Sequence, residues 1–412
     1  MENGYCRFCG HKLTHTFINL GLSPLSNEYI PESNLKHGQM FYPLKVQVCD
    51  QCFLVQAELY QQPEQIFGEY QYFSSYSTSW LEHCKTYVDM IVNQLALSPK
   101  NRVLEIACND GYLLQFFKPY GIPVKGIEPA ENVAMEARAK GIDVDCCFFS
   151  ESTAKEIAGK DGTYDLIIGN NVLAHVPDIK GFVNGLSIVL SPEGTITMEF
   201  PHLLKLIEQN QFDTIYHEHF HYLSLMVVQA IFRTCGLDIY DVEELSTHGG
   251  SIRIYAAHQG RKAIKPGVGL LLAQEQAFGM NDIKMYSHFS ERILDIKADT
   301  LDLLRKLKRD GKRIAAFGAA AKGNTFLNYC GIKDDLIDFV VDSNPHKQGY
   351  YLPGSLIPIT SAEALRQCKP DYLLILPWNL KGEIVEAAGF VEEWGCKFIT
   401  CIPTIHIFQR NE

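Results

Sequence analysis

The run from Phe212 to Ser224, FDTIYHEHFHYLS, concentrates side chains that can take up or release protons. These side chains are Tyr216, His217, Glu218, His219, His221 and Tyr222. Imidazole titrates close to neutral pH, so a histidine beside a carboxylate is well suited to act as a general base. The run therefore predicts acid–base chemistry. Its alternative interpretation is a polar surface loop that happens to be rich in histidine.

Three residues of this run, His217, Glu218 and His221, spell the H-E-x-x-H pattern of zinc proteases. That pattern places two imidazoles on one face of a helix, with the glutamate as the base. It needs a long helix, whereas residues 212–216 are typical of a strand or a loop. Glu243 and Glu244 stand at a tolerable distance for a third ligand, but their DVEEL run is more simply a solvated strand edge. The sequence therefore disfavours a metalloprotease.

The elements that position these residues belong to a chain of 412 residues, a length that predicts two or three domains. Hydrophobic residues make up 46% and charged residues 21%, as in soluble globular proteins. The formal net charge of −11 argues against a nucleic-acid partner, because such partners select for a basic face. The N-terminal residues show no secretory signal, and no apolar run is long enough to span a bilayer. With 13 cysteines and no export signal, we expect reduced thiols, a cytoplasmic location and no membrane partner.

Two C-x-x-C pairs, Cys6 with Cys9 and Cys49 with Cys52, predict a tetrahedral Zn²⁺ site. The residues between the pairs read as a small β-rich module with little core of its own. A metal can replace the missing core in a domain below roughly 70–80 residues. Four cysteine ligands leave no open coordination position, so this zinc is expected to be structural. The alternative is a redox C-x-x-C motif, but a redox pair does not require a matched second pair.

The segment from Phe67 to Trp80, FGEYQYFSSYSTSW, is polar and aromatic, unlike a core strand. It contains Tyr70 and Tyr72. This composition predicts that the segment is either a lid over a site or a plain linker.

From Leu81 onward, helical and strand-like segments alternate, which predicts an α/β fold with a doubly wound parallel sheet. The expected strands lie near residues 102–107, 124–129, 144–149, 164–171 and 195–201. Glu128 stands at the tip of the second strand. An acid at that position accepts hydrogen bonds from both ribose hydroxyls of a bound nucleoside.

The turn after the first strand identifies the kind of nucleoside. A dinucleotide needs G-x-G-x-x-G, so that its pyrophosphate can meet bare backbone. Here the turn has one glycine and an added aspartate, which suits a ligand without phosphates and with a cationic methionine tail, namely S-adenosylmethionine (SAM). The candidate cofactor residues are Glu105, Ala107, Asn109, Asp110, Gly111, Glu128, Pro129, Phe148, Phe149, Asn170 and Asn171.

Two further segments are candidates for the chemistry. His175 follows the fourth strand and is expected to face the methyl donor, unless it is a strand-end imidazole bonded to backbone. Residues 247–253, THGGSIR, open another strand. Their adjacent glycines expose backbone N–H groups, and Arg253 could pair with a phosphate. The alternative for this segment is a hairpin turn.

The C-terminal part predicts a second α/β domain. Apolar residues at helical spacing indicate a long helix from about Met285 to Asp310. Residues 313–325 then read as a strand, a small-residue turn and a helix start, where backbone N–H groups and Lys322 suit a phosphate.

An NAD-binding domain is an alternative for this part alone. Gly318, Ala320 and Gly323 approximate the dinucleotide fingerprint, and Asp342 ends the next strand.

The first turn, the ribose acid, the paired cysteines and the FDTIYHEHF run together resemble the sugar C-methyltransferases. These SAM-dependent enzymes methylate C-3 of nucleotide-linked 4-keto-deoxysugars. The resemblance covers nearly the whole chain. It implies a zinc-binding module with the lid segment at 1–80, a SAM-binding class I methyltransferase domain at 81–290, and a Rossmann-like nucleotide-sugar-binding domain at 291–412. Ala107 and Asn109 stand where most class I methyltransferases have glycines.

The resemblance also implies residue roles. His219 is the base that removes the proton from C-3, and Glu218 orients it or binds a sugar hydroxyl. Tyr70, Tyr216 and His175 donate to the C-4 oxyanion or hold the sugar. The residues implied to bind the sugar nucleotide are Tyr72, Tyr222, His248, Gly249, Arg253, Gly318, Ala321, Lys322, Asn324, Asp342, Lys347 and Asn379.

The implied partner is a dTDP- or GDP-linked 4-keto-6-deoxysugar, and the resemblance favours a monomer. Two other classes are alternatives: an NAD-dependent oxidoreductase of nucleotide sugars that uses the C-terminal turn, and a non-catalytic zinc- and SAM-binding module.

Overall fold

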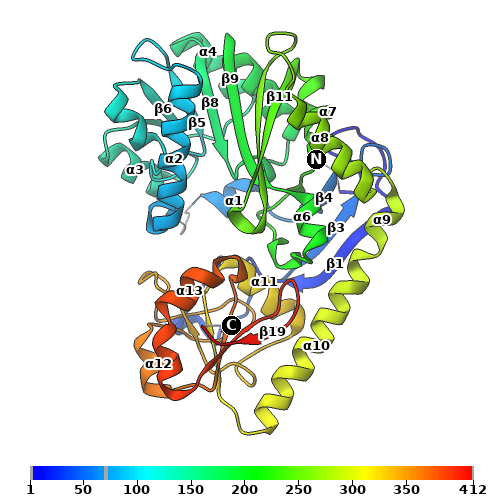
Figure 1. Ribbon diagram of the computed structural model, residues 1–412, viewed down its shortest axis with the longest axis vertical. Coiled ribbons are helices and arrows are strands. Elements are labelled where there is room, and N and C mark those ends of the chain that lie inside the picture. Colours follow the sequence, from blue (N-terminus) through cyan, green and yellow to red (C-terminus); the bar gives the residue numbers. More distant parts are fainter. Residues whose placement is uncertain (1–2, 69–72, 411–412) are drawn as a thin grey trace. The chain divides into compact units, whose positions relative to one another are not determined.

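The computed structural model describes residues 3–68 and 73–410, which form two compact units. The first unit comprises Met1–Thr14, Cys49–Leu204 and Phe220–Asn281, and the second comprises His15–Val48, Lys205–His219 and Asp282–Glu412. Each unit is built on its own sheet flanked by helices (Figure 1). The run from Phe212 to Ser224 is therefore divided: its residues up to His219 belong to the second unit, and those from Phe220 on belong to the first.

The large sheet of the first unit has the strand order β11-β12-β9-β8-β5-β6-β7. Its strands are β5 (Val103–Ile106), β6 (Val124–Ile127), β7 (Asp143–Asp145), β8 (Tyr164–Asn170), β9 (Leu190–Pro201), β11 (Leu237–Leu245) and β12 (Ser251–His258). Strands β5 to β9 are parallel, and β12 is antiparallel to both β9 and β11. The strand order reverses between β5 and β8, which is where open α/β sheets bind ligands.

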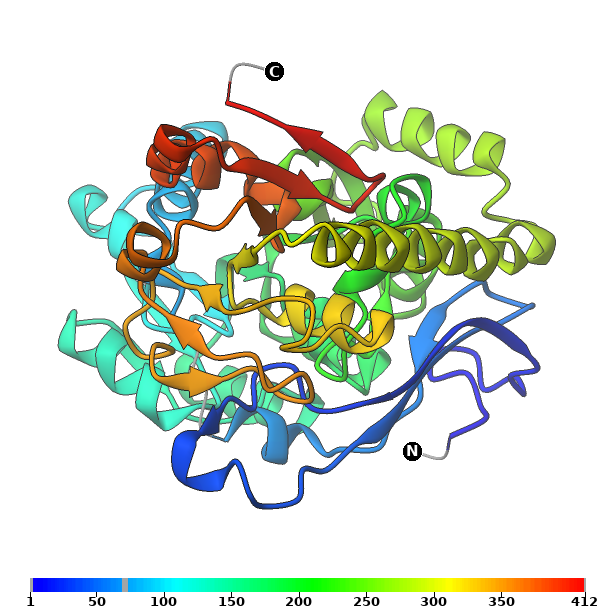
Figure 2. The same cartoon turned by 90° about the horizontal axis from the view of Figure 1, so that it is seen from below.

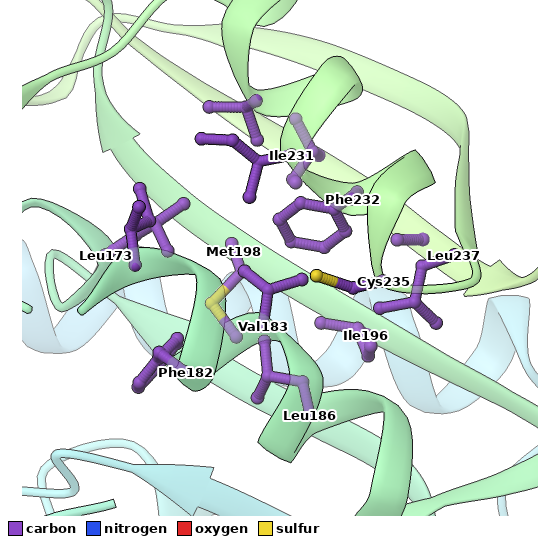
Figure 3. Close-up of a cluster of buried hydrophobic side chains, with 14 of the residues drawn as sticks. Leu173, Phe182, Val183, Leu186, Ile196, Met198, Ile231, Phe232, Cys235 and Leu237 are labelled. Carbon is purple, nitrogen blue, oxygen red and sulfur yellow. The ribbon is translucent and has the colours of Figure 1, made fainter. Parts of the chain in front are cut away.

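Helices cover both faces of this sheet, as the predicted doubly wound fold requires. Leu166 packs on the face covered by α2 (Thr78–Gln94) and α3 (Glu131–Ala139). Ile167 packs on the face covered by α4 (Glu151–Asp161), α5 (Ile179–Val189) and α7 (Leu225–Thr234). Neighbouring residues point to opposite faces because a strand repeats every two residues. Figure 3 shows side chains of α5, α7 and β9 meeting in the core on the Ile167 face of the sheet. Among them are Val183, Leu186, Ile196, Met198, Ile231 and Phe232.

One local prediction for this unit was wrong in detail. The strand expected at 195–201 begins at Leu190, because the chain stays extended through Pro192 and Gly194 and the register with β8 shifts between Tyr164 and Leu166. The segment after the turn that follows β5 forms a 3₁₀ helix, Leu114–Tyr120, with Pro119 inside it. The remaining elements are α1 (Pro63–Phe67), α8 (Pro266–Phe278), and β4 (Val55–Ala57), which pairs antiparallel with β10 (His221–Tyr222).

The second unit has a sheet of order β16-β14-β13-β17-β18-β19, with antiparallel β19 at its edge (Figure 2). Its strands are β13 (Ile314–Phe317), β14 (Val340–Val341), β16 (Ile359–Thr360), β17 (Tyr372–Ile375), β18 (Lys397–Thr400) and β19 (His406–Phe408). Numbered along the chain, this is the 3-2-1-4-5-6 order of the Rossmann fold, whose ligand position lies between its first and fourth strands. Those strands are β13 and β17. The predicted Rossmann-like domain is thus confirmed.

The long helix predicted from Met285 to Asp310 is present as α9 (Ile283–Ser287) and α10 (Phe289–Arg309). The buried residues of α10 recur at helical spacing: Phe289, Ile293, Ile296, Thr300, Leu304 and Leu307. The other elements of this unit are β1 (His15–Ser23), β2 (Ile30–Pro31), β3 (Tyr42–Val48), β15 (Tyr350–Tyr351), α11 (Ala321–Cys330), α12 (Glu363–Cys368) and α13 (Lys381–Ala387). Helix α6 (Leu203–Glu208) spans the change from the first unit to the second. Among the described helices, none combines the length and apolar character that crossing a bilayer requires.

Candidate active site

The four predicted zinc ligands lie together in the first unit. The Sγ atoms of Cys6, Cys9, Cys49 and Cys52 are all within 4.8 Å of one another. Each C-x-x-C pair sits in a tight turn closed by a 2.9 Å backbone hydrogen bond, from Gly10 N to Cys6 O and from Phe53 N to Cys49 O. Zn–S bonds of about 2.3 Å at tetrahedral angles separate sulfur atoms by a little under 4 Å, so the cluster fits one structural Zn²⁺.

The H-E-x-x-H residues do not form a second metal site. Residues 215–220 are not helical. Within the described parts of the chain, the four cysteines are the only group of three or more His, Cys, Asp or Glu side chains able to hold a metal ion. His217 donates from Nε2 to the carbonyl of Pro43 (3.2 Å), and His221 accepts at Nε2 from Arg7 (3.2 Å). Burial lowers the pKa of both imidazoles, which therefore serve as neutral structural groups.

The turn after β5 has the backbone conformation of a glycine-rich turn although it contains one glycine. The angle φ is 58° at Ala107, 48° at Asn109 and 75° at Gly111. A side chain in this left-handed region costs roughly 1–2 kcal/mol, and residues held there often mark functional sites. Ala107 and Asn109 therefore adopt the left-handed backbone conformation of a glycine-rich turn, although neither is a glycine.

Gly111 is the residue of this turn that tolerates a side chain least. Besides its positive φ, an added methyl group would overlap Cδ1 of Ile142. We expect Gly111→Ala to destabilise the protein by roughly 1–3 kcal/mol and to weaken SAM binding at least about tenfold. Melting temperature and calorimetric titration with SAM measure both effects. The control is Gly159→Ala on α4, where an added methyl group meets no atom within 4 Å. Unchanged SAM affinity in Gly111→Ala would contradict the assignment of this turn.

Polar atoms without partners gather at the carboxyl ends of β5 and β8. Glu105 is 0% exposed, and neither of its carboxyl oxygens has a hydrogen-bond partner among the described residues. The same holds for Oδ1 of Asp110, Nδ2 of Asn170 and Oδ1 of Asn171. Burial raises the pKa of Glu105 well above its usual value. Buried polar atoms normally have partners, so this set fits a polar ligand such as the amino-acid tail and ribose of SAM.

Glu128, the predicted ribose acid, is held in place by backbone N–H groups. Its Oε2 accepts from Asn109 N and its Oε1 from Ala130 N, both at 2.9 Å. Burial raises the pKa of this carboxyl to about 7. Each carboxyl oxygen has a second lone pair, so Glu128 can also accept from ribose hydroxyls.

The aromatic segment contacts the cofactor turn through its C-terminal end. Ser74 N donates to Oδ1 of Asn109 (2.9 Å), and Ser75 N donates to Oδ2 of Asp110 (3.3 Å). Lys140 also donates to Oγ of Ser75 (2.9 Å). These contacts favour the lid interpretation over a plain linker. The predicted residues Tyr70 and Tyr72 lie outside the described residues.

The other predicted cofactor contacts have different surroundings. Phe149 packs edge-on against Phe182, with 5.3 Å between ring centroids, and belongs to the hydrophobic core. Phe148 is exposed, so it offers the more accessible ring for a ligand. Pro129 accepts a hydrogen bond at its carbonyl from Sγ of Cys146 (3.4 Å). The geometry thus supports Phe148 as a cofactor contact better than Phe149.

Arg253 is already paired with carboxylates. Its guanidinium lies 2.8 Å from Oε2 of Glu199 and 3.1 Å from Oε2 of Glu243, and it stacks on the ring of Tyr87. His83 also bonds Glu199, at 2.9 Å. These contacts neutralise Arg253 and argue against the predicted phosphate contact. The sequence reasoning missed Glu199, although an acid near the end of an apolar strand is a usable signal.

The predicted residues around the 247–253 turn lie beside the cofactor edge. His248 Nε2 is 3.0 Å from Nδ2 of Asn171, and its ring lies against Trp80 with 5.4 Å between centroids. Gly249 has a φ of 91°, and the turn leads directly into β12. His175 is half-buried in a 3₁₀ turn, Leu173–His175, that follows β8. Tyr222 is buried on β10.

In the second unit, a hydrogen bond and a ring contact fix the orientation of His219, the predicted base. Its Nδ1–H donates to the carbonyl of Thr214 (2.7 Å), which places the lone pair on Nε2. Its ring packs against Tyr216, with 4.1 Å between centroids. Glu218 is buried, and its Oε1 accepts from Nδ2 of Asn27 (2.5 Å). An imidazole with a fixed ring, a basic Nε2 and an adjacent carboxylate is the arrangement of a general base.

The turn after β13, predicted to bind a phosphate, is tightly packed and hydrogen-bonded. Gly318 has a φ of 94°, and an added methyl group there would overlap Pro377. Ala319 N donates to Oδ2 of Asp342 (2.8 Å), and Lys347 donates to the carbonyl of Ala319 (2.8 Å). These contacts fix the backbone of the turn at Ala319.

The predicted residues beyond that turn divide into two groups. Lys322 donates to Oδ1 of Asn379 (3.0 Å), so the turn after β13 meets the segment after β17 at the Rossmann ligand position. Ala321 begins α11. Asn324 instead is buried and donates to the carbonyl of Ser26 (2.5 Å), a structural contact.

The segment that carries His219 is hydrogen-bonded to α11 and to the segment that follows β17. Oγ1 of Thr325, on α11, donates to the carbonyl of Ile215 (3.0 Å). Nε1 of Trp378 donates to Oδ2 of Asp213 (2.8 Å), whose pKa burial raises to about 6. His219 and the turn after β13 thus belong to the same compact unit.

Sequence reasoning missed the contribution of residues 26–29 to this unit. Asn27 holds Glu218, and the hydroxyl of Tyr29 donates to the carbonyl of Ala319 (2.7 Å). No periodicity or motif distinguishes these residues, because their partners lie far away in the sequence.

The strand order of the first unit, the left-handed turn after β5 and the buried acid Glu128 at the end of β6 define a class I SAM-dependent methyltransferase domain. Three family models match the chain: a zinc binding domain over residues 6–67, a methyltransferase domain over 80–242 and a C-methyltransferase C-terminal domain over 246–403. The C-methyltransferase NovU of Streptomyces niveus is 36% identical over 407 residues, which cover 98% of this chain and 97% of NovU. The chain therefore belongs to the C-methyltransferase family, and it is a SAM-dependent C-methyltransferase with a zinc-binding domain.

More distant similarity is confined to part of the chain. A ubiquinone biosynthesis O-methyltransferase of Rhizobium leguminosarum bv. trifolii is 31% identical over 23% of this chain and 38% of its own. The solved structure of magnesium protoporphyrin IX methyltransferase (ChlM) from Synechocystis, with bound SAH, shares 17% identity. The structural match covers 43% of this chain and 83% of ChlM. Its TM-score of 0.35 is too low for the match to support the family assignment.

Proposed function

We propose that this protein methylates C-3 of a nucleotide-linked (dTDP or GDP) 4-keto-6-deoxyhexose, in deoxysugar biosynthesis. The observation that carries the proposal is the orientation of His219. Its Nδ1–H is bound to the Thr214 carbonyl, so Nε2 is the basic nitrogen, and its segment is packed into a Rossmann-like body suited to a nucleotide. A base is needed because a carbon beside a ketone becomes a nucleophile only after it loses a proton.

In this proposal the residues of the chain act on the sugar as follows. Nε2 of His219 takes the proton from C-3, and the C-4 oxygen takes up the negative charge. Tyr216, His175 and Tyr70 donate hydrogen bonds to that oxygen or hold the sugar. Each preorganised donor at a developing oxyanion contributes about 3–4 kcal/mol. Glu218, fixed by Asn27, orients the imidazole or binds a sugar hydroxyl.

When bound, SAM supplies the methyl group. The residues proposed to hold it are Glu105, Asp110 and Asn170 through the amino-acid tail, and Glu128 through the ribose. The Ser74–Ser75 end of the lid segment fixes Asn109 and Asp110 and helps to exclude water from the site. Excluding water matters because a solvent-exposed enolate is readily reprotonated.

The nucleotide sugar is proposed to bind where the turns after β13 and β17 meet. Backbone N–H groups at the start of α11 and the charge of Lys322 suit a diphosphate. Gly318, Ala321, Asp342, Lys347 and Asn379 complete this set. We also propose the division at residues 80 and 290 into three functional parts, a monomer, and a cytoplasmic location. None of the 13 cysteines forms a disulfide, which fits a reducing compartment.

The test is exchange of solvent deuterium into C-3 of a dTDP- or GDP-linked 4-keto-6-deoxyhexose by the wild-type enzyme, first without and then with SAM. We expect exchange without SAM and a mass gain of about 14 on adding it, the increment of one methyl group in place of a proton. Absence of both with every keto-sugar tested would remove the proposed acceptor. In that case, a nicotinamide absorbance change with the same sugars would support the oxidoreductase alternative for the C-terminal turn.

A further inference from the structure

Arg7 stands between two zinc ligands, Cys6 and Cys9, but its side chain serves a different part of the molecule. Its guanidinium makes three hydrogen bonds within the first unit. Nε donates to Nε2 of His221 (3.2 Å), and one terminal nitrogen donates to the carbonyls of Ala57 (2.6 Å) and Phe220 (2.8 Å). A cationic donor to buried carbonyls forms stronger hydrogen bonds than a neutral one.

The backbone that Arg7 contacts is the segment that directly follows His219. Phe220 is 2% exposed, and its carbonyl accepts from both Arg7 and the N–H of Ala57 (3.0 Å). The N–H of Phe220, which belongs to the peptide bond with His219, donates to the carbonyl of Ala174 (2.8 Å). The residue after the base is therefore held on one side by the zinc turn and on the other by the turn that carries His175.

We call the hydrogen bonds from Arg7 to the carbonyls of Ala57 and Phe220 the clamp. Neither His221 nor Gln56, which also bond to Arg7, can replace it in the clamp. His221 is buried and neutral, so it can accept from Arg7 but cannot replace the cation. Oε1 of Gln56 accepts a hydrogen bond from the backbone N–H of Arg7 (3.0 Å), and its Nε2 donates to the carbonyl of Tyr5 (3.0 Å). It therefore fixes the turn that presents Arg7 rather than the catalytic segment.

We propose that Arg7 is a positioning residue for catalysis, which transmits the order of the zinc turn to the backbone of His219 through the carbonyl of Phe220. This inference rests on the proposed function of His219 as the base. The Thr214 carbonyl fixes the ring of His219, and Arg7 fixes the chain that leaves it. A displacement of about 1 Å at a catalytic group can cost about 10²-fold in rate, so loss of this anchor should be visible in turnover.

The test compares Arg7→Ala with wild type in the zinc-loaded, full-length enzyme. We expect one zinc per chain and a SAM affinity within about threefold of wild type, because the SAM residues do not contact Arg7. We expect C-3 deuterium exchange and kcat to fall by about 30-fold to 100-fold. Millimolar guanidinium chloride should restore at least a fifth of the lost rate, since it can occupy the vacated site. A purely structural role would not be rescued in this way.

A second readout does not depend on the substrate. Amide hydrogen exchange of the peptide that covers residues 217–222 should accelerate in Arg7→Ala, while exchange in α5 stays unchanged. If the wild type exchanges no keto-sugar proton, the proposed function fails, but amide exchange still reports on the clamp. The control His11→Ala removes an exposed contact with Asp50 in the same module and should change neither readout.

Two outcomes would overturn the proposal. One is Arg7→Ala with bound zinc, unchanged amide exchange at 217–222 and C-3 exchange within twofold of wild type. If Arg7→Ala loses zinc or does not fold, Arg7→Lys replaces it, because lysine keeps the charge but cannot span His221 and both carbonyls. Arg7→Lys with wild-type kcat and wild-type amide exchange would then overturn the proposal.

Discussion

Replacing His219 by alanine is expected to abolish C-3 proton exchange and methyl transfer while leaving SAM binding intact. A positioned general base contributes about 10²–10⁴-fold, and Nε2 is the basic nitrogen because Nδ1–H is bound to the Thr214 carbonyl. SAM affinity should stay within about threefold, because the predicted SAM residues lie on other segments. Mass spectrometry of the sugar measures proton exchange, and calorimetry measures SAM binding.

Two comparisons separate loss of the base from loss of structure. His219→Asn can keep a donor toward the Thr214 carbonyl but lacks a basic nitrogen, so it should be as inactive as His219→Ala and more stable. His217→Gln changes the neighbouring imidazole, whose Nε2 donates to the carbonyl of Pro43. It should retain most of the rate per folded molecule. Proton exchange by His219→Ala at more than about a tenth of the wild-type rate would assign the base elsewhere.

The first sheet was predictable because its signals are local. Runs such as 103–106 and 164–170 are mostly apolar over the length of a strand, and each is followed by a polar turn. Glu128 and the turn at 107–111 follow from their places in that alternation. The left-handed φ of Ala107 was not predictable, because alanine rarely adopts it, whereas asparagine, as at position 109, is among the non-glycine residues that do.

The assembly of the second unit was hidden because it depends on contacts between distant segments. Residues 15–48, 205–219 and 282–412 form one body. Asn27 meets Glu218, and Thr325 meets Ile215, across separations that no local pattern reports. The sequence likewise showed six protonatable side chains in one run but not their partners. In the structure His217 and His221 are buried and hydrogen-bonded, and the Thr214 carbonyl fixes the ring of His219, the proposed base.

The same limit applies to the predictions for Arg253 and Phe149. A sequence shows that a cation follows two glycines, but not that Glu199 and Glu243 already neutralise it. It shows two adjacent aromatic residues, but not which one faces Phe182 in the core. Residue type predicts what chemistry a group can perform, whereas its burial and partners decide whether that chemistry is available.

Removing the zinc ligand Cys49 is expected to unfold the zinc module and to stop catalysis. Apparent binding free energies of structural Zn²⁺ are about 10–16 kcal/mol in zinc-finger peptides, which exceeds the stability of a small module with a limited core. Cys49 and Leu54 are buried beside the cluster. The N–H of Cys49 donates to the carbonyl of Leu54 (3.0 Å), and the carbonyl of Cys49 accepts from the N–H of Phe53 (2.9 Å). In Cys49→Ser we expect less than one zinc per chain, faster proteolysis near residues 3–14 and C-3 exchange reduced at least tenfold.

The control for this prediction is Cys146→Ser, an exposed cysteine outside the cluster, which should leave zinc content and rate unchanged. Chelation should reproduce the Cys49→Ser phenotype in the wild type, and adding back Zn²⁺ should reverse it. Thiolates must be deprotonated to bind zinc, so zinc should be lost as pH falls and regained as pH rises. Full zinc content with wild-type melting in Cys49→Ser would show that the metal is held by other residues. Full activity after complete zinc removal would instead show that the module folds, and that Arg7 holds its clamp, without the metal.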